Sequence, residues 1–309
     1  MSFTSTIKEE ITRLENNKLE YIAELSSIVR NNANIENDII ITVENNAVAR
    51  RIFKLIKSIY DVTPNITVRK RYNFNNNLSY ILRIRSKKEI ILKDLSIIID
   101  NTYQNIPKNY IINDEECLRA YLRGLFIATG SVNDTKTSRY HLEFIVDNIE
   151  YAEYISSLLN KFYLNSKVIK REKNYMVYVK EAEKISDFLR IINSYNGVMY
   201  FEDIRIYRDH KNMTNRLNNC EQANMDKIFL TAARQLEDIK VLKENDILDV
   251  LDEKLQEVIK YRELYPESSL QELSEIMSNE LEYEITKSGL NHRFRKLKEI
   301  VNKINNDIK

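Results

Sequence analysis

The last predicted helix of the chain carries the side chains whose types and spacing best suit chemistry on a nucleic acid. The sequence predicts that Thr286 or Ser288 caps this helix and that it buries a stripe through Leu290, Phe294 and Leu297. Arginine can bind guanine through two hydrogen bonds, asparagine can bind adenine in the same way, and lysine mostly neutralises phosphate. The pattern therefore predicts a recognition helix for the major groove. The residues expected to contact DNA are Lys287, Ser288, Asn291, His292, Arg293, Arg295 and Lys296.

Two predicted helices before it complete a helix-turn-helix module. Residues 251–264 form an amphipathic helix, and Ser269 with Glu272 forms a capping box that opens a second, shorter helix. Between residues 236 and 284, 15 acidic residues outnumber 5 basic ones and would repel DNA, whereas residues 286–309 hold seven basic residues against two acidic ones. This asymmetry favours DNA contact by the last helix. A solvated basic helix, or one that binds a protein partner, fits the same pattern.

The sequence lacks the signatures of several kinds of enzyme site. Neither GxGxxG nor GxxxxGK[ST] occurs, which argues against a nucleotide cofactor. His141, His210 and His292 have no paired spacing, and Cys117 and Cys220 lie far apart, so we expect no metal and no cofactor.

The 47 basic and 46 acidic residues nearly cancel, so overall charge does not indicate a partner. No apolar run approaches the length that spans a bilayer, and we expect a cytoplasmic, nucleoid-associated protein.

A ridge of small residues predicts a helix that another helix approaches closely. Ala120, Gly124 and Ala128 are four residues apart, and Gly130 is expected to end the helix in a left-handed conformation. The same kind of ridge occurs 97 positions earlier, in a helix over residues 19–32. We therefore predict that the two helices pack against each other between two half-domains. The residues of this interface are Ala23, Ser27, Asn31, Ala120, Gly124 and Ala128.

The segments after these helices repeat each other. Val43-Glu44-Asn45 corresponds to Val146-Asp147-Asn148, which lies 103 positions later, and the helices that follow share the same apolar spacing. Each half is predicted to run α-β-β-α-β-β-α, with a helix over residues 88–101 closing the first half. The predicted fold class is therefore α+β, with two pseudo-symmetric half-domains followed by an all-helical domain.

Basic residues alternate with apolar ones in the predicted hairpin of each half. Alternation places these basic residues on one face of each strand. The pattern fits contact with DNA and simple exposure to solvent equally well. The hairpin residues considered as additional DNA contacts are Arg69, Arg71, Arg83, Arg85, Lys167 and Arg171.

Three parts follow from these patterns. Residues 1–211 form the doubled domain, with half-domains over about 1–110 and 111–211. Residues 212–246 form a connecting helical segment, and residues 247–309 form the helix-turn-helix domain.

The block Tyr121-Leu-Arg-Gly-Leu-Phe-Ile-Ala-Thr-Gly-Ser-Val132 resembles the LAGLIDADG motif of homing endonucleases. The whole chain resembles the WhiA family of bacterial regulators, which join a degenerate LAGLIDADG domain to a helix-turn-helix. The blocks that carry this resemblance are residues 120–133, 215–224 and 287–297. The resemblance implies a DNA-binding transcription regulator linked to sporulation, cell division and chromosome segregation. It also implies other transcription factors or RNA polymerase as protein partners.

The resemblance further implies that nuclease chemistry is lost. LAGLIDADG enzymes place an acid at the end of each contact helix to hold divalent ions, whereas Asn32 and Thr129 occupy those positions here. We therefore expect a sequence-specific DNA-binding regulator without nuclease activity. Two alternatives stay open at this point: a metal-dependent LAGLIDADG-type endonuclease, and a protein-interaction scaffold.

Overall fold

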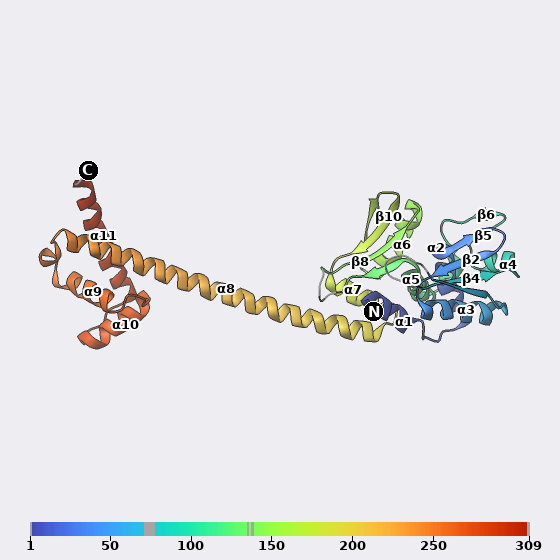
Figure 1. Ribbon diagram of the computed structural model, residues 1–309, viewed down its shortest axis with the longest axis horizontal. Helices are drawn as coiled ribbons and strands as arrows, with labels where there is room; N and C mark the ends of the chain where they lie inside the picture. Colours follow the sequence, from blue (N-terminus) through green and yellow to red (C-terminus); the bar gives the residue numbers. More distant parts are fainter. Residues whose placement is uncertain (1, 71–77, 135, 137–138, 308–309) are drawn as a thin grey trace. The chain divides into compact units, whose positions relative to one another are not determined.

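The computed structural model describes all residues except 1, 71–77, 135, 137–138 and 308–309 (Figure 1). The chain divides into two compact units, Met1–Arg208 (unit 1) and Asp209–Lys309 (unit 2). Arg71, one of the basic hairpin residues, lies outside the described residues.

Unit 1 contains the same succession of elements twice, which confirms the predicted α-β-β-α-β-β-α order. The first half comprises α2 (Lys18–Asn32), β1 (Ala33–Ile35), β2 (Ile39–Val43), α3 (Asn46–Tyr60), β3 (Asn65–Lys70), β4 (Leu78–Ile84) and α4 (Lys88–Asp94). The second half comprises α5 (Glu115–Thr129), β7 (Gly130–Val132), β8 (Leu142–Val146), α6 (Ile149–Lys161), β9 (Lys167–Arg171), β10 (Asn174–Val179) and α7 (Ala182–Ile191). Helix α1 (Phe3–Ile11) precedes them, and the short helix η1 (Asn109–Ile112) joins the halves.

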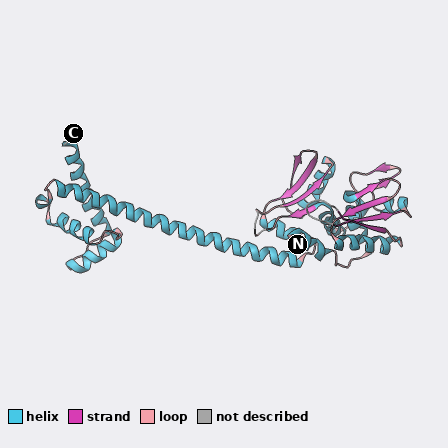
Figure 2. Cartoon of the chain, viewed as in Figure 1, coloured by secondary structure: helices cyan, strands magenta, loops and turns pink. Residues whose placement is uncertain are grey.

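The two sheets have equivalent topologies. Their strand orders are β1-β2-β4-β3 and β7-β8-β10-β9, all antiparallel. Asn45 and Asn148 explain part of the sequence repeat, because each side chain caps the helix that follows by accepting two backbone N–H groups. Figure 2 shows the two groups of strands with helices between them.

Helices α2 and α5 pack together in the middle of unit 1, as Figure 1 shows. A Cβ atom at Gly124 would lie 2.2 Å from the backbone oxygen of Glu24, so the two backbones touch where α5 has no side chain. Ala23, Ser27 and Ala120 are fully buried, and Asn31 and Ala128 are half-buried. The small side chains thus lie along the line where the helices meet.

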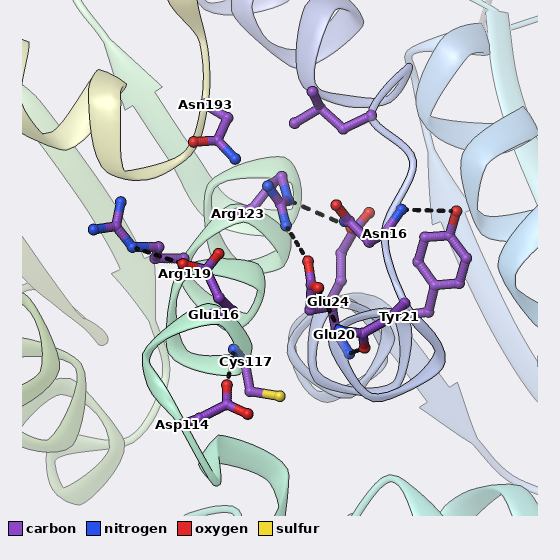
Figure 3. A network of polar contacts seen from close by, with 12 residues as sticks. Asn16, Glu20, Tyr21, Glu24, Asp114, Glu116, Cys117, Arg119, Arg123 and Asn193 are labelled. Carbon is purple, nitrogen blue, oxygen red and sulfur yellow. Dashed lines mark hydrogen bonds and ion pairs between the residues drawn. The ribbon is translucent and has the colours of Figure 1, made fainter.

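A buried network of charges lies beside this contact. Arg51 binds both carboxylate oxygens of Glu24 at 2.8 Å, and Arg123 from α5 lies 3.5 Å from Glu24 and 3.8 Å from Glu20. Figure 3 shows Arg123 reaching from α5 to the two glutamates on α2. Burial lowers the pKa of Arg123, and the attraction of Glu24 opposes that effect. Two arginines and two glutamates balance in charge, which makes their burial tolerable.

The helix predicted over residues 88–101 is wrong in its second half, because α4 ends at Asp94. Ser96 adopts a left-handed conformation with φ of 55°, and the chain then forms the small hairpin of β5 (Ile98–Ile99) and β6 (Thr102–Tyr103). Tertiary hydrogen bonds fix this turn: the Ser96 hydroxyl accepts from the backbone of Lys108, and its carbonyl accepts from Arg30. Local periodicity carries no information about such partners.

The predicted left-handed end of α5 is also wrong. Gly130 has φ of −74° and begins β7 as ordinary extended backbone. A Cβ atom there would lie 2.4 Å from Cδ2 of Phe126. Glycine therefore serves close packing at this position.

The connecting helical segment predicted over residues 212–246 overlaps a longer helix, which begins well before it. Helix α7 ends at Ile191, and α8 (Tyr195–Glu244) runs for 50 residues across the boundary between the two units. The carboxylate of Glu10 on α1 accepts hydrogen bonds from the backbone of Asn196 and Gly197 at its start. This long-range cap sets where α8 begins, and a sequence pattern cannot reveal it.

Unit 2 contains the second part of α8, η2 (Leu248–Val250), α9 (Glu253–Leu264), α10 (Leu270–Leu281) and α11 (Lys287–Asp307). Apolar residues of all four α-helices form a separate core. Among the described residues, no helix combines the length and hydropathy needed to span a membrane. The all-helical character of this unit agrees with the predicted fold class.

Candidate DNA interface

The turn between α10 and α11 is held by defined hydrogen bonds. The hydroxyl of Ser278 accepts from the backbone N–H of Ile285 at 2.9 Å, and Glu282 ends α10 in a left-handed conformation with φ of 57°. The capping box of Ser269 and Glu272 forms as the sequence indicates, with both reciprocal hydrogen bonds present. The start of α10 and its connection to α11 are therefore fixed.

Helix α11 begins at Lys287, with Thr286 as its cap. The Thr286 hydroxyl accepts a hydrogen bond from the backbone of Gly289 at 3.1 Å. Leu290, Phe294 and Leu297 are buried in the core of unit 2. The apolar stripe thus orients the helix so that its other side faces solvent.

Six of the seven residues proposed for DNA contact are exposed on α11. They are Lys287, Ser288, Asn291, His292, Arg295 and Lys296. In the part of the chain that the structure describes, no carboxylate forms an ion pair with Lys287, Arg295 or Lys296. The seventh, Arg293, is half-buried and lies 3.8 Å from a carboxylate oxygen of Glu257, so it faces the protein.

The described basic hairpin residues of unit 1 are all exposed: Arg69, Arg83, Arg85, Lys167 and Arg171. Arg69 and Arg83 share a face through the register of β3 and β4, and Lys167 and Arg171 share one on β9. Acidic neighbours reduce their charge: Arg83 and Arg85 pair with Asp38, and Arg171 pairs with Glu143. These sheet faces carry mixed charge, unlike the exposed face of α11.

The ends of the two central helices adjoin a small polar cavity. Asn32 is the last residue of α2, and Thr129 is the last residue of α5. The cavity has a volume of about 180 Å³, and its lining includes Thr129, Arg30 and Asp147. Arg30 donates hydrogen bonds to the backbone carbonyls of Ser96 and Gln104. A fixed cation therefore lines this cavity.

The chain matches relatives along nearly its whole length. It is 45% identical over 311 residues to the Probable cell division protein WhiA of Bacillus cereus (strain B4264), covering 98% of this chain and 97% of that protein. The chain belongs to the WhiA family. The protein of the same name from Macrococcus caseolyticus (strain JCSC5402) is 43% identical over 311 residues, with 99% and 98% covered. The resemblance seen in the sequence is confirmed.

Family models also agree with the WhiA assignment. Residues 19–98 match the WhiA N-terminal LAGLIDADG-like domain, residues 118–211 the WhiA LAGLIDADG-like domain, and residues 214–301 the WhiA C-terminal HTH domain. The crystal structure of full-length DUF199/WhiA from Thermatoga maritima aligns with a TM-score of 0.58 at 23% identity, covering 98% of this chain and 99% of that one. The WhiA fold predicted from the sequence is therefore confirmed.

The divalent metal of LAGLIDADG enzymes does not fit the residues of this WhiA-family chain. Asn32 and Thr129 are neutral, and the Thr129 hydroxyl donates weakly to the carbonyl of Leu125 at 3.4 Å. Asp147 is the one carboxylate among the described residues that line the adjoining cavity, and Arg30 faces the same space. Hard cations need several anionic oxygens, and a neighbouring guanidinium repels them. Among the described residues, no group of three or more His, Cys, Asp or Glu side chains is placed so that it could hold a metal ion.

Arg30 is not among the site residues predicted from the sequence. It lies in the last turn of α2, directly after the buried apolar residues Ile28 and Val29. A charged side chain next to the apolar residues of this helix is the one sequence feature that could have indicated Arg30 as part of the site. Its guanidinium lies 5.9 Å from the ring centroid of Tyr151, whose hydroxyl is 2.8 Å from that of Tyr121.

Proposed function

We propose that the chain is a sequence-specific DNA-binding transcription regulator that reads DNA through α11. The observation that carries this proposal is the exposed face of α11. Among the described residues, no carboxylate forms an ion pair with its Lys287, Arg295 or Lys296, and the apolar core holds the helix in place. Such a face offers phosphate contacts and base contacts together. An HTH family match over residues 214–301 supports the same reading.

Each side chain of this face has a role that its chemistry suits. Arg295 can bind the O6 and N7 atoms of guanine, and Asn291 can bind adenine at N6 and N7. Lys287 and Lys296 suit phosphate oxygens, and Ser288 and His292 near the start of α11 can contact base edges. Arg293 is the weakest candidate, because Glu257 already lies beside it.

Replacing Arg295 and Lys296 together by alanine is expected to weaken duplex binding and to reduce its salt dependence. Each lost phosphate contact lowers the slope of log affinity against log salt by about 0.9. Fluorescence anisotropy with a labelled duplex at several salt concentrations measures both quantities. The matched control is Lys254→Ala with Lys260→Ala, which removes two exposed positive charges from α9 and should leave the slope unchanged. Equal slopes for the wild type and the α11 variant would place the footprint elsewhere.

We also propose that the LAGLIDADG-like unit has no nuclease activity. Neutral Asn32 and Thr129 with the cation of Arg30 nearby disfavour the divalent ions that this chemistry requires. Supercoiled plasmid incubated with the full chain and Mg²⁺ or Mn²⁺ is expected to stay uncut. Nicking that requires the metal and disappears with a chelator would instead support the endonuclease alternative.

The proposed biological role follows the curated relatives, which are named probable cell division proteins. We propose that this regulator acts on the nucleoid, in cell division and chromosome segregation or in sporulation. Other transcription factors or RNA polymerase are its proposed protein partners. A chain that binds such a partner through unit 2 but binds no duplex would favour the scaffold alternative.

A further inference from the structure

Unit 2 contains a buried positive charge without a counter-ion. The side chain of Arg262 on α9 is 1% exposed, and among the residues described no carboxylate forms an ion pair with it. Its Nη1 donates to the backbone carbonyls of Ser268, at 2.6 Å, and Tyr265, at 3.3 Å, while its Nε has no hydrogen-bond partner. Carbonyl groups brace the guanidinium but leave its net charge uncompensated. Burial of such a charge is costly, so an anion beside it would be favoured.

Arg262 lines a cavity with two further cations. The cavity has a volume of about 320 Å³, and its lining includes Lys227 from α8 and Lys287 at the start of α11. Lys227 and Lys287 are exposed, and in the described part of unit 2 neither forms an ion pair. No acidic residue is among the described residues that line this cavity. Three positive side chains thus converge on one space.

The start of α10 contributes hydrogen-bond donors to the same cavity. Ser269, Leu270 and Gln271 all line it. Glu272 occupies the backbone N–H of Ser269 in the capping box, whereas the N–H groups of Leu270 and Gln271 come before the first intrahelical hydrogen bond, which Leu273 donates. Free N–H groups at a helix start favour anions, and phosphate above all.

We propose that this cavity binds a phosphate group of the DNA backbone, held by Arg262, Lys227, Lys287 and the first N–H groups of α10. The proposal rests on the proposed function, because Lys287 belongs both to the cavity and to the DNA-reading face of α11. That continuity favours a backbone phosphate over free phosphate. A phosphate bound there would fix the position of α11 along the duplex without reading sequence.

The test measures the salt dependence of duplex affinity for the full chain carrying Lys227→Gln, with Lys254→Gln as the matched control. Lys227→Gln is expected to lower the log–log slope by about 0.9, the value of one phosphate contact, and Lys254→Gln is expected to leave it unchanged. Both lysines are exposed, so neither change should disturb folding. Arg262 is avoided as the test position because it also braces the turn before α10.

Amide resonances of Leu270 and Gln271 provide the second measurement. They are expected to shift when a short duplex is added to the full chain, and to shift less with Lys227→Gln. Duplex binding that moves neither amide and keeps the wild-type slope in Lys227→Gln would overturn the phosphate cavity while leaving DNA binding intact. Shifts with inorganic phosphate but none with duplex would assign the cavity to free phosphate and overturn the DNA assignment. Absence of duplex binding by the wild type would overturn the proposed function itself.

Discussion

Gly124→Leu is expected to prevent stable folding of unit 1. Even a single Cβ atom at this position would lie 2.2 Å from the backbone oxygen of Glu24, and backbone cannot move aside as a flexible side chain can. The whole leucine side chain could be placed only by separating α2 from α5. The cost should reach or exceed the upper part of the usual range for overpacking, about 3 kcal/mol. Thermal unfolding followed by circular dichroism measures it.

Two further glycine variants sharpen this experiment. Gly124→Ala should also lower the melting temperature, because its one added carbon already meets the Glu24 backbone. Gly289→Ala on α11 is the control, since the nearest atom to its added carbon is the Thr286 hydroxyl at 3.3 Å. Melting of Gly124→Leu at the wild-type temperature would show that α2 and α5 do not meet at this residue.

Glu24→Gln is expected to destabilise unit 1 by about 3–5 kcal/mol, the usual cost of breaking a buried ion pair by removing one partner. Glu24 is fully buried and is the carboxylate nearest to both Arg51 and Arg123. Its loss would leave two buried guanidinium groups with Glu20 as the remaining carboxylate of the network. Urea unfolding gives the change in free energy.

The same substitution at an exposed pair is the control for Glu24→Gln. Glu15 lies 3.7 Å from Lys54, with their side chains 84% and 65% exposed. Glu15→Gln should change stability by less than about 1 kcal/mol, because solvent screens such pairs. Equal effects of the two substitutions would mean that the Glu24 network contributes no more than a surface pair.

Features set by local patterns were predictable from the sequence. The repeat, the small residues of α2 and α5, and the capping box of α10 depend on spacing within a few residues or on comparison of two segments. The capping residues Asn45 and Asn148 belong to this class, because each serves the helix that follows at once.

Features set by tertiary partners were not predictable. The end of α4 depends on hydrogen bonds from Lys108 and Arg30, and the start of α8 depends on the Glu10 carboxylate of α1. The buried charges are of the same kind. Nothing near Arg262 in the sequence indicates that it lies buried beside a cavity, because burial of a long charged side chain is decided by helices that pack over it.

We propose above all that α11 reads DNA sequence. Selection of bound duplexes from a random-sequence pool by the full chain, in parallel with the variant carrying Asn291→Ala and Arg295→Ala, tests it most directly. We expect the wild type to enrich one motif, the recovered duplexes to be intact, and the variant to lose or relax the motif at one or two positions. Absence of enrichment by the wild type, or an unchanged motif from the variant, would contradict this proposal.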